Sequence, residues 1–377
     1  MRAIRIIVML SALTIALVGC KGTAQPAASP AQPAAGATQP AATGAQPGAA
    51  TAQPATGAAQ PTASAAQPAA SADKKVTIKL AHTIQPTDPI GQGATKFKDV
   101  VEKESNGSIT VQIYPNNELG GENQLFDQLK QGSIQMAITA AGTAGNLVPD
   151  IAVMDAPYVW KDWASEQAVM KGPIFKHFQD EFASQQGLQL LSGTWYYGLR
   201  NLTANKPVRT PDDAKGMKIR TPPAPVNLLA GQVLGGDPTP MDFAQVYLAL
   251  KSGTIDAEEN PLTTIFSNKL YEVQKYIVLT HHQQQSQVVW TNVKFWSSLS
   301  PDQQKAVQDG VQQGGDLAAN LAQKADTDLL TKLQAMQGVT VITNPDYAAF
   351  QARATQLVPQ MKDKWGDLYN QIVSAQK

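Results

Sequence analysis

Two arginines stand at the ends of predicted β-strands and are suited to binding a carboxylate. Apolar and basic residues alternate over 217–220, which predicts a half-buried strand ended by the proline pair 222–223. Arg220 therefore lies at a strand's carboxyl end, where open α/β sheets bind ligands. The segment 188–200 (LQLLSGTWYYGLR) predicts a second strand that ends at Arg200. A planar guanidinium holds a carboxylate bidentately. The spacing leaves open whether that carboxylate belongs to a ligand or to the protein itself.

Signals for catalysis are weak in this sequence. It contains no G-x-S-x-G, H-E-x-x-H, P-loop or G-x-G-x-x-G motif. Its single cysteine, Cys20, excludes an intrachain disulfide and a cysteine-based metal cluster. His281 and His282 are neighbours on a predicted strand, so their side chains point to opposite faces and make a poor metal pair. His82 closes the first predicted strand and is a candidate for a binding site. We expect no catalytic residue, no metal and no cofactor.

The composition fits a globular protein without a nucleic-acid partner. The chain has 377 residues, of which 43% are hydrophobic, enough for one large or two moderate domains. Lys plus Arg and Asp plus Glu both number 30, so the formal net charge is zero. Nucleic-acid-binding proteins usually carry a basic excess.

The amino-terminal residues predict export from the cytoplasm. Two arginines precede an apolar run over 6–18, and a Gly-Cys pair follows it, which predicts a signal peptide over 1–19. The run is short for a membrane span. The residues LVGC resemble the bacterial lipobox, which implies cleavage before Cys20 and a lipid on its sulfur. An ordinary secretory signal with an incidental cysteine is the alternative. The lipid is favoured because Cys20 follows a small residue, ends the apolar run and is the only cysteine.

A long segment of low complexity separates Cys20 from the globular body. Residues 20–73 consist mostly of Ala, Pro, Gln, Thr, Gly and Ser, and Gln-Pro recurs every seven residues. This composition buries too little apolar surface to offset its ordering entropy, so we expect a disordered tether. A flexible chain of this length spans roughly 40 Å. It would carry the body past a cell-wall layer or to a membrane partner; the alternative is a repeat expansion that acts only as a spacer.

From Lys74 onward, strand and helix patterns alternate. Strands are predicted at 76–82, 109–115 and 134–139, with helices at 93–107 and 121–132. This alternation predicts a largely parallel sheet covered by helices on both faces. Further strands are predicted at 217–220, 254–257, 275–280 and 286–293, and helices at 226–234 and 242–251. A helical stretch is predicted from 301 to about 337, interrupted near Gly314 and Gly315. The number of elements favours two α/β lobes.

Three segments resemble a known family. They are YPNNELGGENQLFDQLKQGSIQMAIT, GLRNLTANKPVRTPDDAKGMKIRTPP and GGDPTPMDFAQVYLALKSGTIDAEENPL. From about Lys74, the chain resembles the substrate-binding proteins of tripartite ATP-independent periplasmic (TRAP) transporters. The resemblance implies a two-lobe α/β fold like that of periplasmic binding proteins, with a mixed sheet in each lobe and a long bridging helix. The expected first lobe comprises 74–197 plus about 286–325, and the second comprises 198–285 plus about 326–377 with the C-terminal helices.

The resemblance also assigns roles to particular residues. In this family, the arginine that matches Arg220 clamps the substrate carboxylate, and the one that matches Arg200 supports it. Asn260, in EENPL, matches an asparagine near the same group, and Phe243 matches an aromatic that lines the cleft. His82 and Trp195 stand on predicted strands and are further candidates for the binding site.

One departure bears on the ligand. Sialate-binding members carry a glutamate and an arginine where this chain has Ala140 and Thr143. A heavily hydroxylated sugar acid would lose two polar partners, so we expect a smaller or less polar acid: a dicarboxylate, oxo acid or hydroxy acid. Glu122 falls where the family often has an acidic residue facing the cleft, and it could accept a hydrogen bond from a substrate hydroxyl or amine.

The resemblance predicts a monomeric, lipid-anchored extracytoplasmic receptor for a small organic acid. It would deliver its ligand to a two-part TRAP membrane permease driven by an ion gradient rather than ATP. A receptor that feeds a membrane signalling protein is the alternative, and a neighbouring permease or sensor-kinase gene would separate the two. An exported enzyme on the same scaffold is a third reading, since fold does not fix function.

Overall fold

The structure is a computed structural model that describes residues 74–376. These residues belong to one compact unit, Ala69–Lys377. The predicted signal peptide over 1–19, the lipidation site Cys20 and the tether over 20–73 lie outside the described residues. Within the described part, every helix is too short or too polar to cross a membrane.

The first lobe is built on three strands and two helices whose pattern the sequence predicts. β1 (Val76–His82) pairs in parallel with both β2 (Ile109–Tyr114) and β3 (Met136–Ala140). The helices α1 (Pro89–Glu104) and α2 (Glu122–Gln131) connect them. α1 begins earlier than predicted because Pro89 occupies its first turn and Asp88 caps it by accepting a hydrogen bond from the Ile90 amide.

The second lobe repeats this arrangement with shorter strands. β5 (Lys218–Thr221) pairs in parallel with β6 (Asp237–Pro240) and β7 (Ala257–Pro261). The strand predicted at 254–257 is displaced toward the C-terminus: it begins at Ala257, as β7. The helices of this lobe are α6 (Pro225–Val233), the short η3 (Phe243–Gln245), α7 (Val246–Ser252) and α8 (Leu262–Ser267).

Two long antiparallel strands, β4 (Leu188–Ala204) and β8 (Tyr276–Asn292), join the lobes. β3 of the first lobe pairs with residues 287–291 of β8, whereas β7 of the second lobe pairs with residues 200–204 of β4. The described sheet therefore has the continuous order β2-β1-β3-β8-β4-β7-β5-β6, with β9 (Thr340–Ile342) beside β8. Register shifts along the β4–β8 pair allow it to bend between the lobes.

The prediction of two separate strands at 275–280 and 286–293 was wrong. They form the single strand β8, although the residues between them are all polar. His281 adopts a left-handed backbone conformation with φ of 45°, yet the following glutamines still pair with β4. A run of glutamines on a strand suggests exposure, but here most of their side chains are buried because both faces of β8 are covered.

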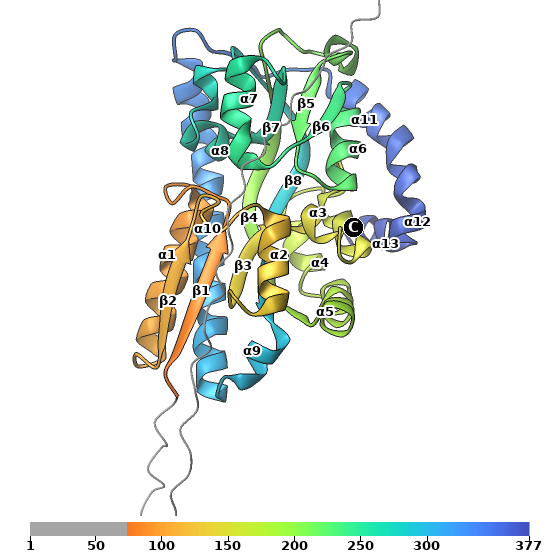
Figure 1. Cartoon of the computed structure of the whole chain (residues 1–377). Coiled ribbons are helices and arrows are strands. Elements are labelled where there is room, and N and C mark those ends of the chain that lie inside the picture. Colours follow the sequence, from red (N-terminus) through yellow and green to blue (C-terminus); the bar gives the residue numbers. More distant parts are fainter. Residues whose placement is uncertain (1–73, 377) are drawn as a thin grey trace, which may run out of the picture. The chain divides into compact units, whose positions relative to one another are not determined.

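The helix α10 (Pro301–Gln334) packs against α1 of the first lobe and α8 of the second, and Figure 1 shows it running alongside both. The predicted interruption at Gly314 and Gly315 was wrong, because α10 continues through both residues. These glycines instead allow close packing. A Cβ on Gly314 would lie 2.7 Å from the Gly93 carbonyl oxygen, and one on Gly315 would lie 2.7 Å from the Trp195 ring.

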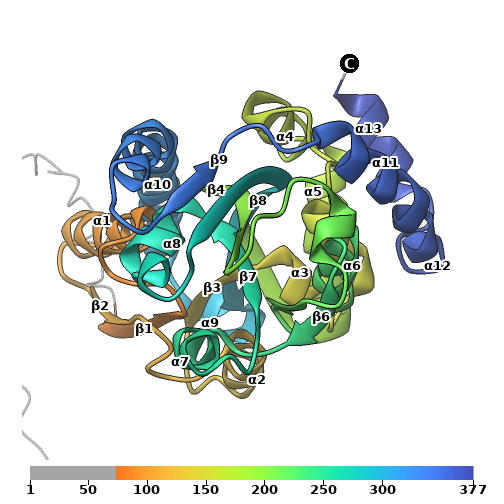
Figure 2. The same ribbon diagram turned by 90° about the horizontal axis from the view of Figure 1, so that it is seen from above.

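The remaining elements cover the sheet and the edges of the lobes. Viewed from above, α11 (Tyr347–Leu357) lies beside α6 (Figure 2), and the helices that follow it contact η1 (Pro149–Asp155) and α4 (Trp163–Val169). These remaining elements are α3 (Ala141–Ala144), η1 (Pro149–Asp155), α4 (Trp163–Val169), α5 (Pro173–Gln186), η2 (Pro211–Ala214), η4 (Leu270–Glu272), α9 (Val293–Ser298), α11 (Tyr347–Leu357), η5 (Val358–Met361), α12 (Lys362–Trp365) and α13 (Leu368–Ala375).

The tight contact at α10 gives a prediction about stability. Gly314→Ala should lower the free energy of unfolding by about 2 kcal/mol, because the new methyl overpacks a backbone contact. Helix propensity alone would raise it by about 1 kcal/mol. Urea denaturation measures the difference, with Asn320→Ala on the exposed face of α10 as the control. A Gly314→Ala variant as stable as the control would contradict the contact.

Candidate functional site

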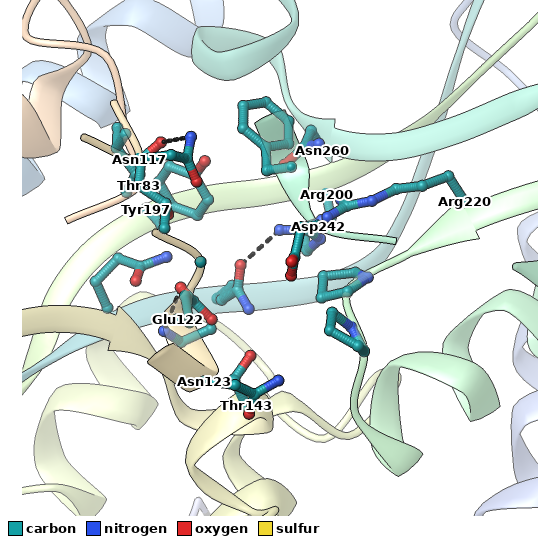
Figure 3. Close-up of a pocket in the computed structure, with 18 residues that line it drawn as sticks. Thr83, Asn117, Glu122, Asn123, Thr143, Tyr197, Arg200, Arg220, Asp242 and Asn260 are labelled. Carbon is teal, nitrogen blue, oxygen red and sulfur yellow. Dashed lines mark hydrogen bonds between the residues drawn. The ribbon is translucent and has the colours of Figure 1, made fainter. Parts of the chain in front are cut away.

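A cavity of about 50 Å³ lies between the two lobes, at the carboxyl ends of their parallel strands. Residues at or just after the ends of β1, β2 and β3 line it from the first lobe, and residues at or just after the ends of β5, β6 and β7 line it from the second. β4 and β8 form its floor with Tyr197, Arg200, Gln285 and Gln287. Figure 3 shows these groups converging from opposite sides.

Arg220 lies at the carboxyl end of β5, as the sequence predicts, and lines the cavity. Its side chain is 3% exposed, and its Nε donates to the Met241 carbonyl oxygen at 2.9 Å. Its guanidinium lies over the Phe243 ring, 5.5 Å from the centroid. Within residues 74–376, no carboxylate oxygen lies within 4.0 Å of it. Burial lowers the pKa of Arg220, although Glu259 and Glu258 oppose that shift.

Arg200 also lines the cavity, but a protein carboxylate already neutralises it. Its Nε lies 2.5 Å from Glu259 Oε2, and its Nη2 lies 2.8 Å from Glu259 Oε1. Its Nη1 donates to Gln285 Oε1 at 2.6 Å. Despite burial, the charge of Arg200 lowers the pKa of Glu259 to about 2. The sequence left open whether each arginine pairs with a ligand carboxylate or with one of the protein. Arg200 pairs with a carboxylate of the protein, and Arg220 does not do so within the described residues.

Next to this pair, Glu258 has a much higher pKa than Glu259. Burial and the neighbouring Glu259 charge raise the pKa of Glu258 to about 7. The Asn260 amide donates to Glu258 Oε2 at 2.5 Å, and Asn260 lines the cavity. His282 Nε2 lies 3.2 Å from Glu259 Oε2 and donates to it, because an ionised carboxylate can only accept. Burial lowers the pKa of His282, although Glu259 opposes that shift.

The cavity brings most of the predicted binding residues together. They are Arg220, Arg200, Asn260, Phe243, Glu122 and Thr143. Glu122 is the first residue of α2, and its Oε1 accepts a hydrogen bond from the Ala140 amide at 3.0 Å. Burial raises the pKa of Glu122, whereas Thr143, the Ala140 amide and both arginines act in the opposite direction.

Two predicted residues lie elsewhere. Trp195 belongs to the core: its Nε1 donates to the Val311 carbonyl oxygen at 3.0 Å, and its ring packs against α10. Tyr197, two positions later on β4, lines the cavity instead. His82 is buried, its Nδ1 accepts from the Ile84 amide, and burial lowers its pKa to about 4. The next residue, Thr83, lines the cavity in its place.

Sequence reasoning missed several lining residues. They are Thr83, Ile84, Asn117, Gly121, Asn123, Tyr197, Asp242, Gln285 and Gln287. Gln285 and Gln287 could have been found from their spacing, because residues two apart on a strand share a face. Asn117 and Asp242 stand in connections whose positions follow only from how the lobes meet.

Comparison with known proteins identifies the family. The family model for bacterial extracellular solute-binding proteins, family 7 (DctP), matches residues 80–364. The chain belongs to this family. Its members include TRAP solute-binding proteins, so the predicted class, a solute-binding protein rather than an enzyme, is confirmed.

Individual relatives of the DctP family cover most of the chain. The 2,3-diketo-L-gulonate-binding periplasmic protein YiaO of Escherichia coli is 31% identical over 73% of this chain and 83% of its own length. The C4-dicarboxylate-binding periplasmic protein DctP of Rhodobacter capsulatus is 31% identical, with 77% and 88% covered. A TRAP periplasmic solute-binding protein of Actinobacillus succinogenes, solved with bound L-galactonate, is 31% identical with a TM-score of 0.76, covering 80% of this chain and 99% of that one. The match to this solved structure confirms the predicted two-lobe fold.

The unequal pairing of the two arginines can be tested by stability. Arg200→Met should lower the free energy of unfolding by about 3–5 kcal/mol, because it leaves the buried Glu259 charge without its main partner. Arg220→Met should leave that free energy unchanged or raise it, because it removes a buried cation that has no ion-pair partner. Urea denaturation of both variants measures this. Equal destabilisation would show that Arg220 is also paired within the protein.

Buried carboxyl groups predict an unusual pH dependence. Burial raises the pKa of several of them to between about 6 and about 8: Asp88, Asp155, Glu166, Glu258 and Asp326. Between pH 5 and 8, the folded protein loses these protons as the pH rises, whereas the unfolded chain, with values of 3.8 and 4.5, has already released them. The free energy of unfolding should therefore fall as pH rises over that range.

Thermal denaturation between pH 4.5 and 8 measures this slope, and Glu258→Gln should make it shallower. Below about pH 4.5, stability should fall again, because Glu259 contributes only while it is ionised. A melting temperature that is constant or rises from pH 5 to 8 would contradict the prediction.

Proposed function

We propose that this protein is an extracytoplasmic receptor that captures a small organic acid between its lobes and delivers it to a TRAP membrane permease. One observation carries the proposal: Arg220 is buried in the cavity with no carboxylate of the described protein to neutralise it. A carboxylate that arrives with the ligand supplies the missing charge. The bidentate geometry of a guanidinium suits that role, and the Phe243 ring holds the planar group in position.

The same geometry links ligand binding to the closure of the lobes. Arg220 comes from the second lobe, whereas Glu122 and Thr143 come from the first, so one ligand contacts both. The lobes also touch at the rim, where Asn146 Nδ2 donates to the Pro223 carbonyl oxygen at 2.9 Å. In an open arrangement, water would solvate Arg220. Closure removes that water, and an anion then favours the closed form over the open one.

The permease would recognise this closed form. We propose that the domains follow the boundaries expected from the sequence, with hinge segments in β4 and β8. We also propose that a lipid on Cys20 anchors the protein to the cell membrane, with the tether over 20–73 between anchor and body, and that the receptor is a monomer. The lipobox-like residues support the anchor. Stable anchoring needs two or more acyl chains, which a bacterial lipoprotein cysteine supplies.

The names of the relatives suggest the first ligands to test. Those proteins bind 2,3-diketo-L-gulonate, C4-dicarboxylates and L-galactonate. A cavity of about 50 Å³ favours the smaller acids, since a single water needs about 10–15 Å³ by the same measure. A thermal-shift screen would find the ligand, because a concentration of about 100 times the dissociation constant adds roughly 2.7 kcal/mol of stability.

Substitution of Arg220 tests the clamp. Arg220→Lys should weaken binding of an acid found in that screen by about 2 kcal/mol or more, because lysine cannot hold a carboxylate bidentately. Arg220→Ala should weaken binding further and still fold. Isothermal titration calorimetry gives the affinities, with Arg209→Lys, an exposed arginine of the same lobe, as the control. Unchanged affinity in Arg220→Lys would remove this residue from the binding site.

A further inference from the structure

Several polar atoms of residues that line the cavity are buried acceptors without a hydrogen-bond partner among the described residues. Asn117 shows this clearly, because its Nδ2 donates to the Thr83 carbonyl oxygen at 3.1 Å. That bond fixes the amide so that Oδ1 is an acceptor. Asn117 Oδ1 is buried and has no hydrogen-bond partner among the described residues. An unpartnered buried acceptor is costly, and a donor on the ligand would satisfy it.

Glu122 adds a second acceptor on the same side of the cavity. Glu122 Oε1 accepts from the Ala140 amide at 3.0 Å, and Thr143 acts to lower the pKa of this carboxyl group. Figure 3 places the carboxylate on the opposite side of the cavity from the Arg220 guanidinium. Thr143 and Gln287 also line this part, and Thr143 Oγ1 and Gln287 Oε1 are buried without a partner. A hydroxyl can donate or accept, so Thr143 adapts to either kind of ligand group.

The charged residues that line the cavity also favour a ligand with a single carboxylate. Of the two arginines that line the cavity, Arg200 is neutralised by Glu259, which leaves only Arg220 for a ligand anion. The acidic lining residues are Glu122 and, at the exposed rim, Asp242. A second carboxylate on the ligand would therefore approach the Glu122 carboxyl group with no second free arginine among the described lining residues, and two carboxylates in one buried site cannot both stay ionised without a large cost.

We propose that the cavity selects a monocarboxylate whose far end carries hydrogen-bond donors, either hydroxyl or ammonium, and that Glu122 and Asn117 discriminate against dicarboxylates. This inference rests on the proposed function, since Arg220 must hold the carboxylate. Family membership does not decide it, because one relative is named for C4-dicarboxylates and another was solved with a sugar acid.

A matched series of four-carbon acids tests the proposal. Butyrate has no donor, 4-hydroxybutyrate and 4-aminobutyrate each carry one at the far end, erythronate carries three hydroxyls, and succinate carries a second carboxylate. Calorimetry on the wild-type protein should give an affinity for the best donor-bearing acid at least about tenfold above those for butyrate and succinate. The hydroxyl and amino members show which donor the site prefers. Gluconate and glucarate repeat the comparison at six carbons.

Variants of the two acceptors identify the cause of the selectivity. Glu122→Gln removes the carboxyl group and supplies an amide donor, so the succinate affinity relative to that of the donor-bearing acids should rise by about tenfold. Asn117→Leu should weaken binding of the donor-bearing acids more than that of butyrate. Glu118→Gln, an exposed acid outside the cavity lining, makes the same chemical change and should alter neither ratio.

The outcomes separate this inference from the proposed function. The selectivity would be overturned if succinate or glucarate bound the wild-type protein as tightly as the donor-bearing acid of equal length. If Arg220→Lys then lost that binding, the receptor function would still stand. Selectivity that persists unchanged in Glu122→Gln and Asn117→Leu would overturn the roles of these residues. Failure of every acid in both series to bind would count against the receptor function itself, and the selectivity would fall with it.

Discussion

The ion pair between Arg200 and Glu259 determines the chemistry of the cavity. It places two opposite charges 2.5 Å apart in a region shielded from water, and the bonds to Gln285 and His282 help to offset the cost of their burial. Because this pair is complete, the second guanidinium, Arg220, is the lining cation without an ion-pair partner among the described residues. One neutralised and one available arginine therefore define a site for a single negative charge.

The fold makes that site depend on both lobes. β4 and β8 pass through the lobe junction, where Arg200 of β4, paired with Glu259 of β7, lies on the floor of the cavity. β5 supplies Arg220 from one side, and α2 supplies Glu122 from the other. Figure 1 shows α10 spanning the same junction, with its glycines packed closely against α1 and β4. A ligand that contacts groups on both sides stabilises their approach, so the protein reports occupancy through the arrangement of its lobes.

Most of the fold could be predicted from periodicity and from residues that end helices and strands. Alternation predicts β1, β2 and β5, and glycines correctly mark the ends of helices such as α2. The errors fall where long-range packing overrides local preference. The polar residues of β8 remain in a buried strand because its neighbours cover both faces, and Gly314 and Gly315 remain helical because they lie against a neighbouring backbone and Trp195.

The sequence by itself determined the type of residue at each strand end, and with it the expectation that an arginine meets a carboxylate. Only the tertiary structure decided which carboxylate each arginine meets. Glu258 and Glu259 are adjacent in the chain, yet the pairing of β4 with β7 brings Glu259 to Arg200 and leaves Arg220 to the cavity. Such choices depend on strand register and on how the lobes meet. These are contacts between distant parts of the chain, and local patterns do not encode them.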